Sequence, residues 1–319
     1  MKILLKINIV VLMLLSVKGI AQDQNYFSFT EVYEESIKES FEYKTKRFNS
    51  FDSTQIAYYE FKAKGNSIAN LVFIHGGGAN SKLGYLKLAK TLSEQYHVTT
   101  YLMDLRGHGE SAGRRGDAPS VHSVFVDISM LLNIVREKDK PLYLGGHSSG
   151  AGTVLNYSVQ EGLADADGYL FVSPYMGDEV QTTRVDAVKF FDVDIPKFIA
   201  NAQSGGVDKL NEYAVFFNYP KEVLRANPSI VTALTVCMAN ATTPYAANEL
   251  FKYVSKPFGL FIGENDEIFD AEKVLQFDTL PTYRNPKSIS KIIPKEKHLS
   301  ILNTIGIELG ETITQWQAM

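Results

Sequence analysis

The chain has 319 residues, of which 45% are hydrophobic and 21% are charged, and its formal net charge is −4. This composition supplies enough apolar side chains for one large α/β domain and excludes a largely disordered chain. Lys and Arg are scattered along the chain without a basic cluster, so we expect no nucleic-acid partner.

Residues 1–21 have the pattern of a secretory signal peptide. Lys2 and Lys6 precede a short apolar run at 9–15, and small residues occupy the −3 and −1 positions before a cut after Ala21. An uncleaved N-terminal anchor is the alternative, but the apolar run is shorter than the ~20 residues that a membrane-spanning helix needs. We therefore expect export to a periplasm or to the medium, with no stable membrane span after signal cleavage.

Cys237 is the only cysteine, so no intrachain disulfide can form in the exported protein. Its stability must then come from the packed core. The apolar context of this cysteine, TALTVCMA, predicts a buried side chain.

From residue 54 onward, apolar runs that end at glycine-rich or charged turns alternate with segments of helical spacing. The expected strands cover 54–63, 69–74, 98–105, 142–144, 168–174, 258–266 and 288–293. The expected helices cover 85–96, 121–135, the segment after Ser149, 271–278 and a terminal stretch from about Ile301. This alternation predicts βαβ units and an α/β fold with a mostly parallel, doubly wound sheet.

The alternation fails between Pro174 and Pro257, where apolar and aromatic stretches show weak strand character. We expect a helical cap at 175–256, inserted into a core made of 22–174 and 257–319. The aromatic residues of this insertion are expected either to line an apolar acyl or aryl pocket or simply to pack within the cap; they are Phe190, Phe191, Phe198, Phe216 and Phe217.

The sequence GHSSG at 146–150 follows the apolar run 142–144 and precedes a predicted helix. A serine on a tight strand-to-helix bend takes strained backbone angles, and glycines two places either side allow close backbone packing. The helix N-terminus favours negative charge that develops nearby. We predict Ser148 to be a nucleophile; the alternative is an ordinary Gly/Ser-rich turn.

A second glycine-rich turn, HGGG at 75–78, follows the strand predicted at 69–74. Glycines let backbone N–H groups face a cavity, and a tetrahedral acyl intermediate needs two such donors at its oxyanion. The N–H groups of Gly77 and Ser149 are the predicted pair, and an ordinary glycine loop is the alternative.

A serine nucleophile needs a base and an acid that orients the base. His298 lies after the last predicted strand, where the order Ser…Asp…His asks for a histidine, whereas most of the other histidines lie in glycine-rich turns or begin elements. Asp266 follows the strand FGLFIG one strand earlier. Asp270 and Glu264 are the competing acids, although Asp270 is more simply the N-cap of the next helix.

Together with DLRGHGES at 104–111 and GEND at 263–266, these motifs resemble the α/β-hydrolase fold, and within it the serine aminopeptidase S33 or Hydrolase_4 group of monoacylglycerol lipases and lysophospholipases. The resemblance covers about residues 50–319. It implies a serine hydrolase that works through an acyl-enzyme without a metal or an organic cofactor. Ser149 departs from the family's elbow, which often has a bulky apolar residue there, and the cap has no family motif that identifies its substrate.

We therefore expect a secreted hydrolase of carboxylic esters, acting on a small-molecule ester or a lipid-like substrate. An aminopeptidase is one alternative, and it would need acidic cap residues to hold an α-ammonium group. A non-catalytic binding protein on the same scaffold and acyl transfer to an acceptor other than water are the others. The sequence carries no signal for the oligomeric state. The acidic candidates in the cap are Asp178, Glu179, Asp186, Asp192 and Asp194.

Overall fold

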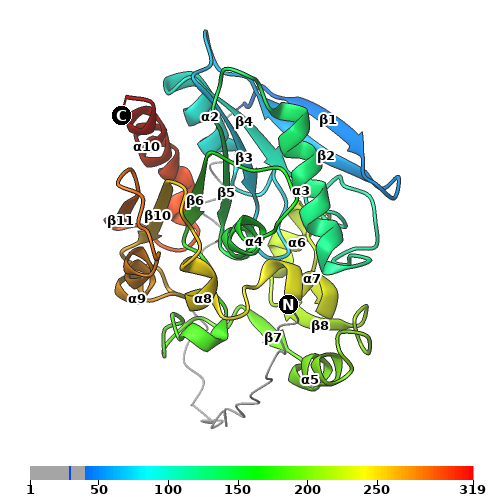
Figure 1. Ribbon diagram of the computed structural model, residues 1–319. Helices are drawn as coiled ribbons and strands as arrows, with labels where there is room; N and C mark the ends of the chain where they lie inside the picture. Colours follow the sequence, from blue (N-terminus) through cyan, green and yellow to red (C-terminus); the bar gives the residue numbers. More distant parts are fainter. Residues whose placement is uncertain (1–28, 30–39, 319) are drawn as a thin grey trace.

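A sheet of eight strands forms the centre of the molecule (Figure 1). The computed structural model describes Phe29 and residues 40–318, so the predicted signal peptide lies outside the described residues. The order of the strands in the sheet is β1-β2-β4-β3-β5-β6-β10-β11. Their bounds are β1 Lys44–Asn49, β2 Gln55–Phe61, β3 Ala69–Ile74, β4 Val98–Met103, β5 Leu142–His147, β6 Gly168–Val172, β10 Phe258–Gly263 and β11 Ile289–Ile293.

All strand pairs are parallel except those of β2, which runs antiparallel to both β1 and β4. Every residue of β3, β4 and β5 is buried, because helices cover both faces of the sheet. This burial explains why these strands read as continuous apolar runs rather than as alternating patterns. The predicted α/β class with a mostly parallel sheet is confirmed.

Helices α2 and α10 pack against one another on one face of the sheet, and α3 and α4 lie on the other (Figure 1). Helix α3 begins after Ser120, whose side chain accepts a hydrogen bond from the Ser123 N–H in a capping box. The helices and 3₁₀ turns of the core are α2 Leu86–Gln95, α3 Val121–Val135, α4 Ser149–Ser158, α9 Ala271–Leu275, η2 Gln276–Thr279, η3 Ser300–Asn303 and α10 Ile305–Ala318.

Strand β1 was not predicted from the sequence. Its residues, KTKRFN, are mostly exposed or half-buried, because β1 is the edge strand of the sheet and pairs only with β2. An edge strand with charged residues carries little hydrophobic signal. Its pairing extends the sheet beyond β2 without contributing to the buried centre.

The segment between β6 and β10 contains strands as well as the expected helices. Strands β7, β8 and β9 form a separate antiparallel sheet of three. Each has only three to five residues, too few to show a clear alternation in the sequence. The elements of this cap, which lies at the lower end of the molecule in Figure 1, are η1 Asp178–Val180, β7 Phe191–Val193, α5 Ile195–Gln203, β8 Tyr213–Phe217, α6 Lys221–Ala226, β9 Ala233–Thr235, α7 Val236–Thr242 and α8 Ala247–Phe251.

The end of the cap segment packs into the core. Helix α7 contacts α3 and α4, and α8 contacts α4. Cys237, in α7, is fully buried, as its apolar context predicted. Helices α7 and α8 thus join the cap sheet to the layer of core helices.

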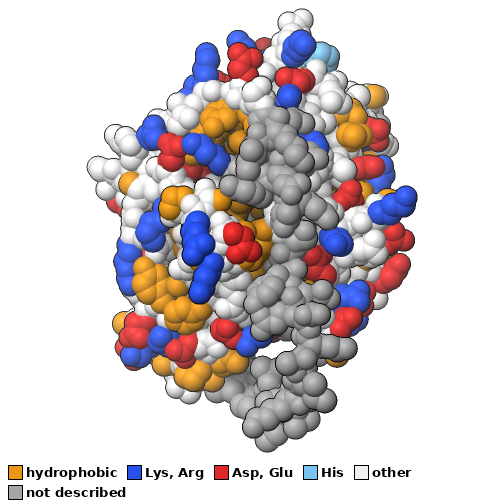
Figure 2. Space-filling model, turned by 180° about the vertical axis from the view of Figure 1, so that it is seen from behind, with side chains coloured by type: hydrophobic (Ala, Val, Ile, Leu, Met, Phe, Trp, Pro, Cys, Tyr) orange, Lys and Arg blue, Asp and Glu red, His pale blue; other side chains and the backbone are white. Residues whose placement is uncertain are grey.

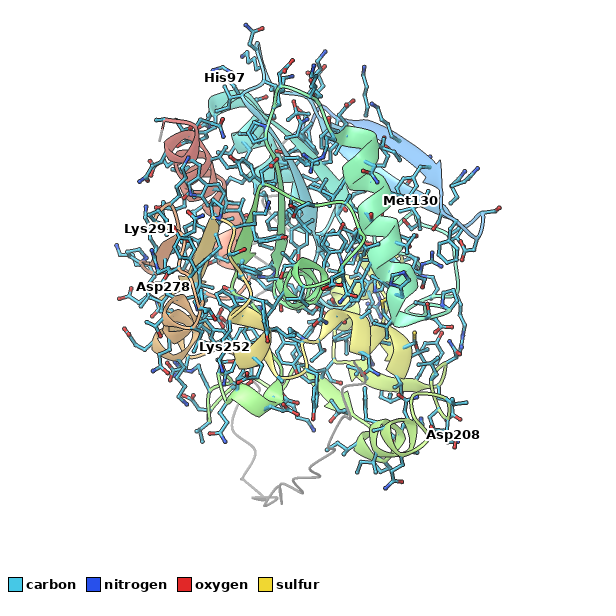
Figure 3. All side chains as sticks on the ribbon, viewed as in Figure 1. His97, Met130, Asp208, Lys252, Asp278 and Lys291 are labelled. Carbon is cyan, nitrogen blue, oxygen red and sulfur yellow. The ribbon has the colours of Figure 1, made fainter. Side chains whose placement is uncertain are left out.

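Charged side chains of both signs are interspersed over the face seen in Figure 2, with apolar side chains between them. In Figure 3 the side chains fill the space between sheet and helices, while labelled residues such as Lys291 and Asp208 project outward. Within the described part of the chain, no helix is both long and apolar enough to cross a membrane.

Candidate active site

Ser148 lies on the bend between β5 and α4, with φ 55° and ψ −123°. This left-handed φ is strained for a residue with a Cβ, as a nucleophile elbow requires. The flanking glycines allow the bend: a Cβ on Gly146 would lie 2.4 Å from the carbonyl carbon of Gly150, and one on Gly150 would lie 2.4 Å from the carbonyl oxygen of His75. The bend holds Ser148 half-exposed above the sheet.

The three side chains predicted as a triad lie together. Nε2 of His298 is 3.1 Å from Oγ of Ser148, and Nδ1 of His298 is 2.9 Å from Oδ2 of Asp266. Asp266 follows β10 and His298 follows β11, so strands adjacent in the sheet deliver the acid and the base. Both side chains are buried, whereas the Ser148 side chain remains accessible.

Asp266 is held in place by backbone donors. Its Oδ1 accepts hydrogen bonds from the N–H groups of Ile268 (3.0 Å) and Phe269 (2.9 Å). Burial alone would raise the pKa of the Asp266 carboxyl, but the imidazole of His298 and these donors outweigh burial, and the pKa lies below its usual value. Asp266 is therefore a carboxylate at neutral pH, able to accept the Nδ1–H of His298.

The competing acids have other roles. Asp270 is the N-cap of α9, accepting a hydrogen bond from the Lys273 N–H at 3.2 Å, as the sequence predicted. Oε2 of Glu264 accepts from the N–H of Lys295 at 2.9 Å, which supports the loop before His298. Asp266 is the acid that lies at the imidazole.

Two backbone N–H groups face the space beside Ser148, one in the loop before α2 and one at the start of α4. The N–H groups of Gly77 and Ser149 donate to no acceptor in the part of the chain that the structure describes. The two residues are adjacent, because a Cβ on Gly77 would lie 3.4 Å from Oγ of Ser149. The N–H of the neighbouring Gly76 is not available, since it donates to the hydroxyl of Tyr85 at 2.7 Å.

His147 connects that loop to the loop of His298. Its Nδ1 lies 3.0 Å from the Tyr85 hydroxyl and its Nε2 lies 2.9 Å from the carbonyl oxygen of His298. Burial, followed by the nearby His298, lowers the pKa of His147 to about 3, so its ring is neutral. A neutral ring that donates from Nε2 accepts at Nδ1 from the Tyr85 hydroxyl. The sequence placed His147 in a structural role but gave no signal for Tyr85.

A role for Glu267 at the site was also not predicted from the sequence. Its Oε2 accepts a hydrogen bond from the backbone N–H of His298 at 2.9 Å, and the ring of Phe269 packs edge-on against that imidazole. Both residues lie within three positions after Asp266, so a single loop orients the imidazole and its supporting backbone.

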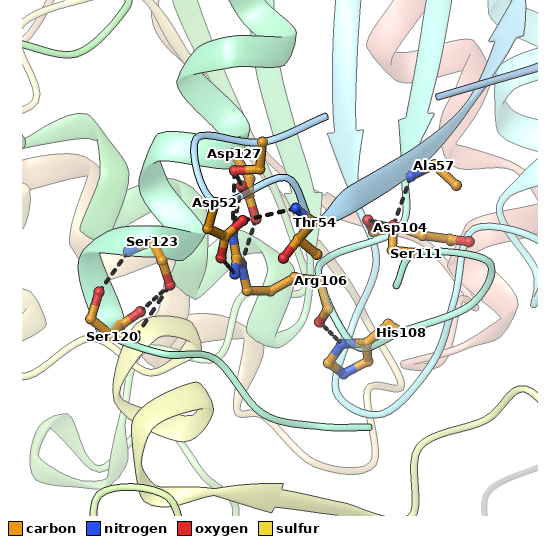
Figure 4. Close-up of polar contacts among 11 residues, drawn as sticks. Asp52, Thr54, Ala57, Asp104, Arg106, His108, Ser111, Ser120, Ser123 and Asp127 are labelled. Atoms are coloured by element: carbon orange, nitrogen blue, oxygen red, sulfur yellow. Dashed lines mark hydrogen bonds and ion pairs between the residues drawn. The ribbon is translucent and has the colours of Figure 1, made fainter. Parts of the chain in front are cut away.

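The turn at 104–111 is a buried scaffold (Figure 4). Asp104 accepts hydrogen bonds from the Ser81 N–H, the Glu110 N–H and the Tyr59 hydroxyl, and Ser111 donates to the Asp104 carbonyl. The Gly107–His108 turn is fixed in the same way, because His108 donates from Nδ1 to the carbonyl of Arg106 at 3.0 Å.

Arg106 anchors this turn in the core by a buried ion-pair network. Its guanidinium binds Asp127 through Nε (2.7 Å) and Nη2 (2.8 Å), and Asp52 through Nη1 (2.9 Å) (Figure 4). The partners come from α3 and from the turn between β1 and β2. The network thus ties the edge of the sheet to the loop beside the candidate site.

The two exposed histidines, His97 and His122, lie elsewhere, and His122 is in the first turn of α3. His97 precedes β4, whereas the candidate site lies at the opposite, carboxyl ends of the strands, and Figure 3 shows His97 at the top of the molecule. Among the described residues, no group of three or more His, Cys, Asp or Glu side chains is arranged to hold a metal ion.

The family model of Hydrolase_4, described as serine aminopeptidase, S33, matches residues 65–290, which is more than half of the chain. The chain belongs to the Hydrolase_4 family. It has the α/β-hydrolase fold, as the motifs at 75–78, 104–111 and 146–150 had suggested.

Solved structures share the Hydrolase_4 fold at low sequence identity. A soluble variant of monoglyceride lipase from Saccharomyces cerevisiae, solved with a substrate analog, superposes with a TM-score of 0.65 at 18% identity, covering 87% of this chain and 96% of that one. At this identity the likeness is one of fold.

Curated relatives match shorter stretches. An uncharacterized abhydrolase domain-containing protein of Dictyostelium discoideum is 28% identical over 134 residues, which are 42% of this chain and 14% of that protein. Protein phosphatase methylesterase 1 of Debaryomyces hansenii is 26% identical over 148 residues, which are 44% of this chain and 36% of that protein. The chain therefore spans well under half of the length of either relative.

Proposed function

We propose that this Hydrolase_4 chain hydrolyses carboxylic esters, with Ser148 as nucleophile, His298 as general base and Asp266 as the acid that orients the base. The observation that carries the proposal is the pair of contacts at one imidazole, 3.1 Å to the Ser148 hydroxyl and 2.9 Å to the Asp266 carboxylate. These distances are those of a serine activated by a neighbouring base.

In the proposed mechanism, His298 takes the proton from Ser148 as the serine oxygen attacks the ester carbonyl. The negative charge that develops on the carbonyl oxygen is met by the N–H groups of Gly77 and Ser149. Protonated His298 then gives its proton to the leaving alcohol, and an acyl-enzyme remains on Ser148. His298 next activates a water molecule, which releases the acid and restores the serine.

The surroundings of Gly77 support an ester with an apolar acyl or aryl group. A Cβ on Gly77 would lie 2.9 Å from the ring of Phe217, which in turn packs 5.5 Å from the ring of Phe190. Apolar side chains beside the donors match a small-molecule ester or a lipid-like substrate. The names of two similar proteins, a monoglyceride lipase and a methylesterase, point to the same chemistry.

The aminopeptidase alternative has weaker support, because most of the acidic cap residues already have partners. Asp186 pairs with Arg184, Asp192 with Lys189, and Asp194 with Lys197. Asp178 accepts a hydrogen bond from the Tyr175 hydroxyl at 3.0 Å. A carboxylate that already binds a cation or a hydroxyl is a poor receptor for the α-ammonium group of a peptide.

A panel of p-nitrophenyl esters from acetate to dodecanoate, run beside an aminoacyl-arylamide, tests this function. We expect hydrolysis of the esters, little or no hydrolysis of the amide, and loss of ester hydrolysis in Ser148→Ala. Efficient cleavage of the amide alone would favour the aminopeptidase. Ester hydrolysis that persists within a few-fold in Ser148→Ala would overturn the proposed mechanism.

Export through the N-terminal signal peptide is part of the same proposal. The sequence pattern of residues 1–21 supports it. Expression of the full chain in a bacterium followed by N-terminal sequencing should give a mature protein that starts at Gln22. Recovery of the chain with residues 1–21 intact in the cytoplasm would contradict export.

A further inference from the structure

The oxyanion loop at 75–78 has three glycines in series, so its backbone is intrinsically free to rotate. An N–H group that stabilises an oxyanion must nevertheless point at the oxyanion position before the reaction begins, because it stabilises the transition state only if it is already oriented. The loop therefore needs restraints from outside, and each of its peptide groups has one.

Two of these restraints come from the core. The N–H of Gly76 donates to the Tyr85 hydroxyl at 2.7 Å. The carbonyl oxygen of Gly76 lies 2.9 Å from Nδ1 of His75, whose Nε2 accepts the N–H of Leu105 at 3.2 Å, so Nδ1 carries the proton and donates. The planar peptide that bears the Gly77 N–H is thereby held at its carbonyl end.

The other two restraints come from the cap. The hydroxyl of Tyr219 donates to the carbonyl oxygen of Gly77 at 2.8 Å, and the N–H of Val231 donates to the carbonyl oxygen of Gly78 at 2.8 Å. Burial raises the pKa of Tyr219 well above its usual value, so the hydroxyl keeps its proton and remains a donor. The peptide groups on both sides of Gly77 are thus held, one from the core and one from the cap.

Tyr219 is itself fixed by aromatic packing. It lies two positions after the end of β8, and its ring lies 5.0 Å from that of Phe190, 6.0 Å from that of Phe217 and 5.2 Å from that of Phe29. The ring of Phe217 also covers Gly77 and Gly78, where an added Cβ would lie 2.9 Å and 2.7 Å from it. Packing within this aromatic cluster therefore holds the Tyr219 hydroxyl against the Gly77 carbonyl.

We propose that Tyr219 is a positioning residue for catalysis: through its hydrogen bond to the Gly77 carbonyl, the cap holds the Gly77 N–H in the direction that stabilises the oxyanion. This inference rests on the proposed serine-hydrolase mechanism. Its consequence is that the cap forms part of the oxyanion hole in addition to covering the substrate. Displacing Tyr219 weakens stabilisation of the transition state without touching Ser148, His298 or Asp266.

The test is Tyr219→Phe in the mature full-length chain, with Tyr213→Phe as a matched control. Tyr213 is also a cap tyrosine whose hydroxyl donates 2.8 Å to a core carbonyl, that of Arg115, but it makes no contact with the oxyanion loop. For p-nitrophenyl butyrate we expect Tyr219→Phe to lower kcat by about tenfold at unchanged KM, less than the ~10²-fold or more of a deleted donor. Its rate of labelling by a fluorophosphonate should fall by a similar factor. Tyr213→Phe should remain within twofold of wild type in both assays.

Thermal unfolding separates this role from a general loss of structure: Tyr219→Phe loses a part-buried hydrogen bond and Tyr213→Phe an exposed one, so Tyr219→Phe should melt somewhat lower but remain fully folded at the assay temperature. An unchanged kcat in Tyr219→Phe, an equal loss in both variants, or a change in KM alone would overturn the inference. If wild type hydrolyses no ester and is not labelled, the proposed function fails instead. If wild type is active, Ser148→Ala is inactive and Tyr219→Phe behaves as wild type, only the role of Tyr219 fails.

Discussion

Two charged regions of the molecule, the turn at 104–111 and the outer cap at 184–212, are stabilised in different ways. In the turn, Asp104 and Arg106 are buried, and Arg106 binds Asp52 and Asp127, which are 54 and 21 positions away along the chain. In the cap the ion pairs join residues two or three positions apart at the surface, such as Lys209 with Glu212.

The difference shows which region bears on the site. Long-range buried ion pairs fix the turn at 104–111, which lies beside the oxyanion loop, whereas the ion pairs of the outer cap are local and exposed and contribute little to stability. Substitutions in the core rim should therefore have large effects, and equivalent substitutions in the outer cap should have small ones.

The largest effect is expected on activity, from Asp266→Asn. The amide keeps the size of the side chain, but it no longer supplies the carboxylate that holds His298 in the tautomer with a free Nε2 acceptor. We expect kcat for p-nitrophenyl butyrate to fall by about 10⁴-fold. Glu264→Gln, which alters the competing acid, serves as the control and should stay within a few-fold of wild type. A similar loss in both variants would mean that the wrong carboxylate has been assigned.

The next largest effect is expected on stability, from Asp127→Ala. This change removes the main partner of the buried Arg106 guanidinium and should lower the free energy of unfolding by about 3–5 kcal/mol. Lys209→Ala breaks an exposed ion pair of the cap and should leave the urea midpoint unchanged. Urea unfolding of both variants compares the two kinds of ion pair. Equal midpoints would show that the buried network of Arg106 stabilises the chain no more than an exposed pair of the cap.

Two glycines with positive φ sharpen the comparison at the level of the backbone. A Cβ on Gly116 (φ 65°) would lie 2.0 Å from the carbonyl oxygen of Ala233, where the core loop meets β9, while one on Gly205 (φ 70°) would meet nothing within 4 Å. We expect Gly116→Ala to cost about 3 kcal/mol, from the clash and the strained φ, and Gly205→Ala about 1 kcal/mol, from the φ alone. The melting temperature of Gly116→Ala should therefore be lower than that of Gly205→Ala. Equal decreases in melting temperature would show that the contact between the core loop and β9 accommodates a Cβ as readily as an exposed loop does.

A separate effect concerns pH. Burial lowers the pKa of His108 and of His147 to about 3, so both rings stay neutral in the folded chain. Below about pH 6.5 these histidines bind protons in the unfolded chain but not in the folded one. The free energy of unfolding is therefore highest above that pH, and from there towards pH 3 it falls by about 1.4 kcal/mol per pH unit for each ring.

Urea unfolding at intervals from pH 8 to pH 5 measures this slope. His108→Asn keeps a donor near the Arg106 carbonyl and should reduce this slope by the contribution of one histidine. A free energy of unfolding that stays flat from pH 8 to pH 5 would show that the buried rings take up protons without unfolding.

The core and its rim were predictable from the sequence because their signals are local. Strands buried on both faces read as apolar runs, and the elbow at 146–150 needs glycines at fixed spacing, since only glycine fits against the carbonyl groups that pass there. Ser148, Asp266 and His298 follow β5, β10 and β11, and the carboxyl ends of these parallel strands lie at one edge of the sheet. The N-cap role of Asp270 likewise depends only on the residues that follow it.

The sequence did not reveal the cap sheet or the contacts that support the site. Strands β7 to β9 are too short for a periodic pattern and are stabilised by pairing across the insertion. Tyr85 and Tyr219 contact the glycine loop from 9 and 142 positions away, and no local motif marks either of them. Contacts of this kind depend on tertiary packing, which a single sequence does not display.

The most direct test of the account is to identify the residue that a fluorophosphonate modifies. Peptide mass spectrometry of the labelled protein should place the adduct on Ser148, and labelling should be lost in Ser148→Ala and strongly slowed in His298→Ala. An adduct on any other residue, or undiminished labelling of Ser148→Ala, would contradict the assignment of Ser148, His298 and Asp266 as the reacting group.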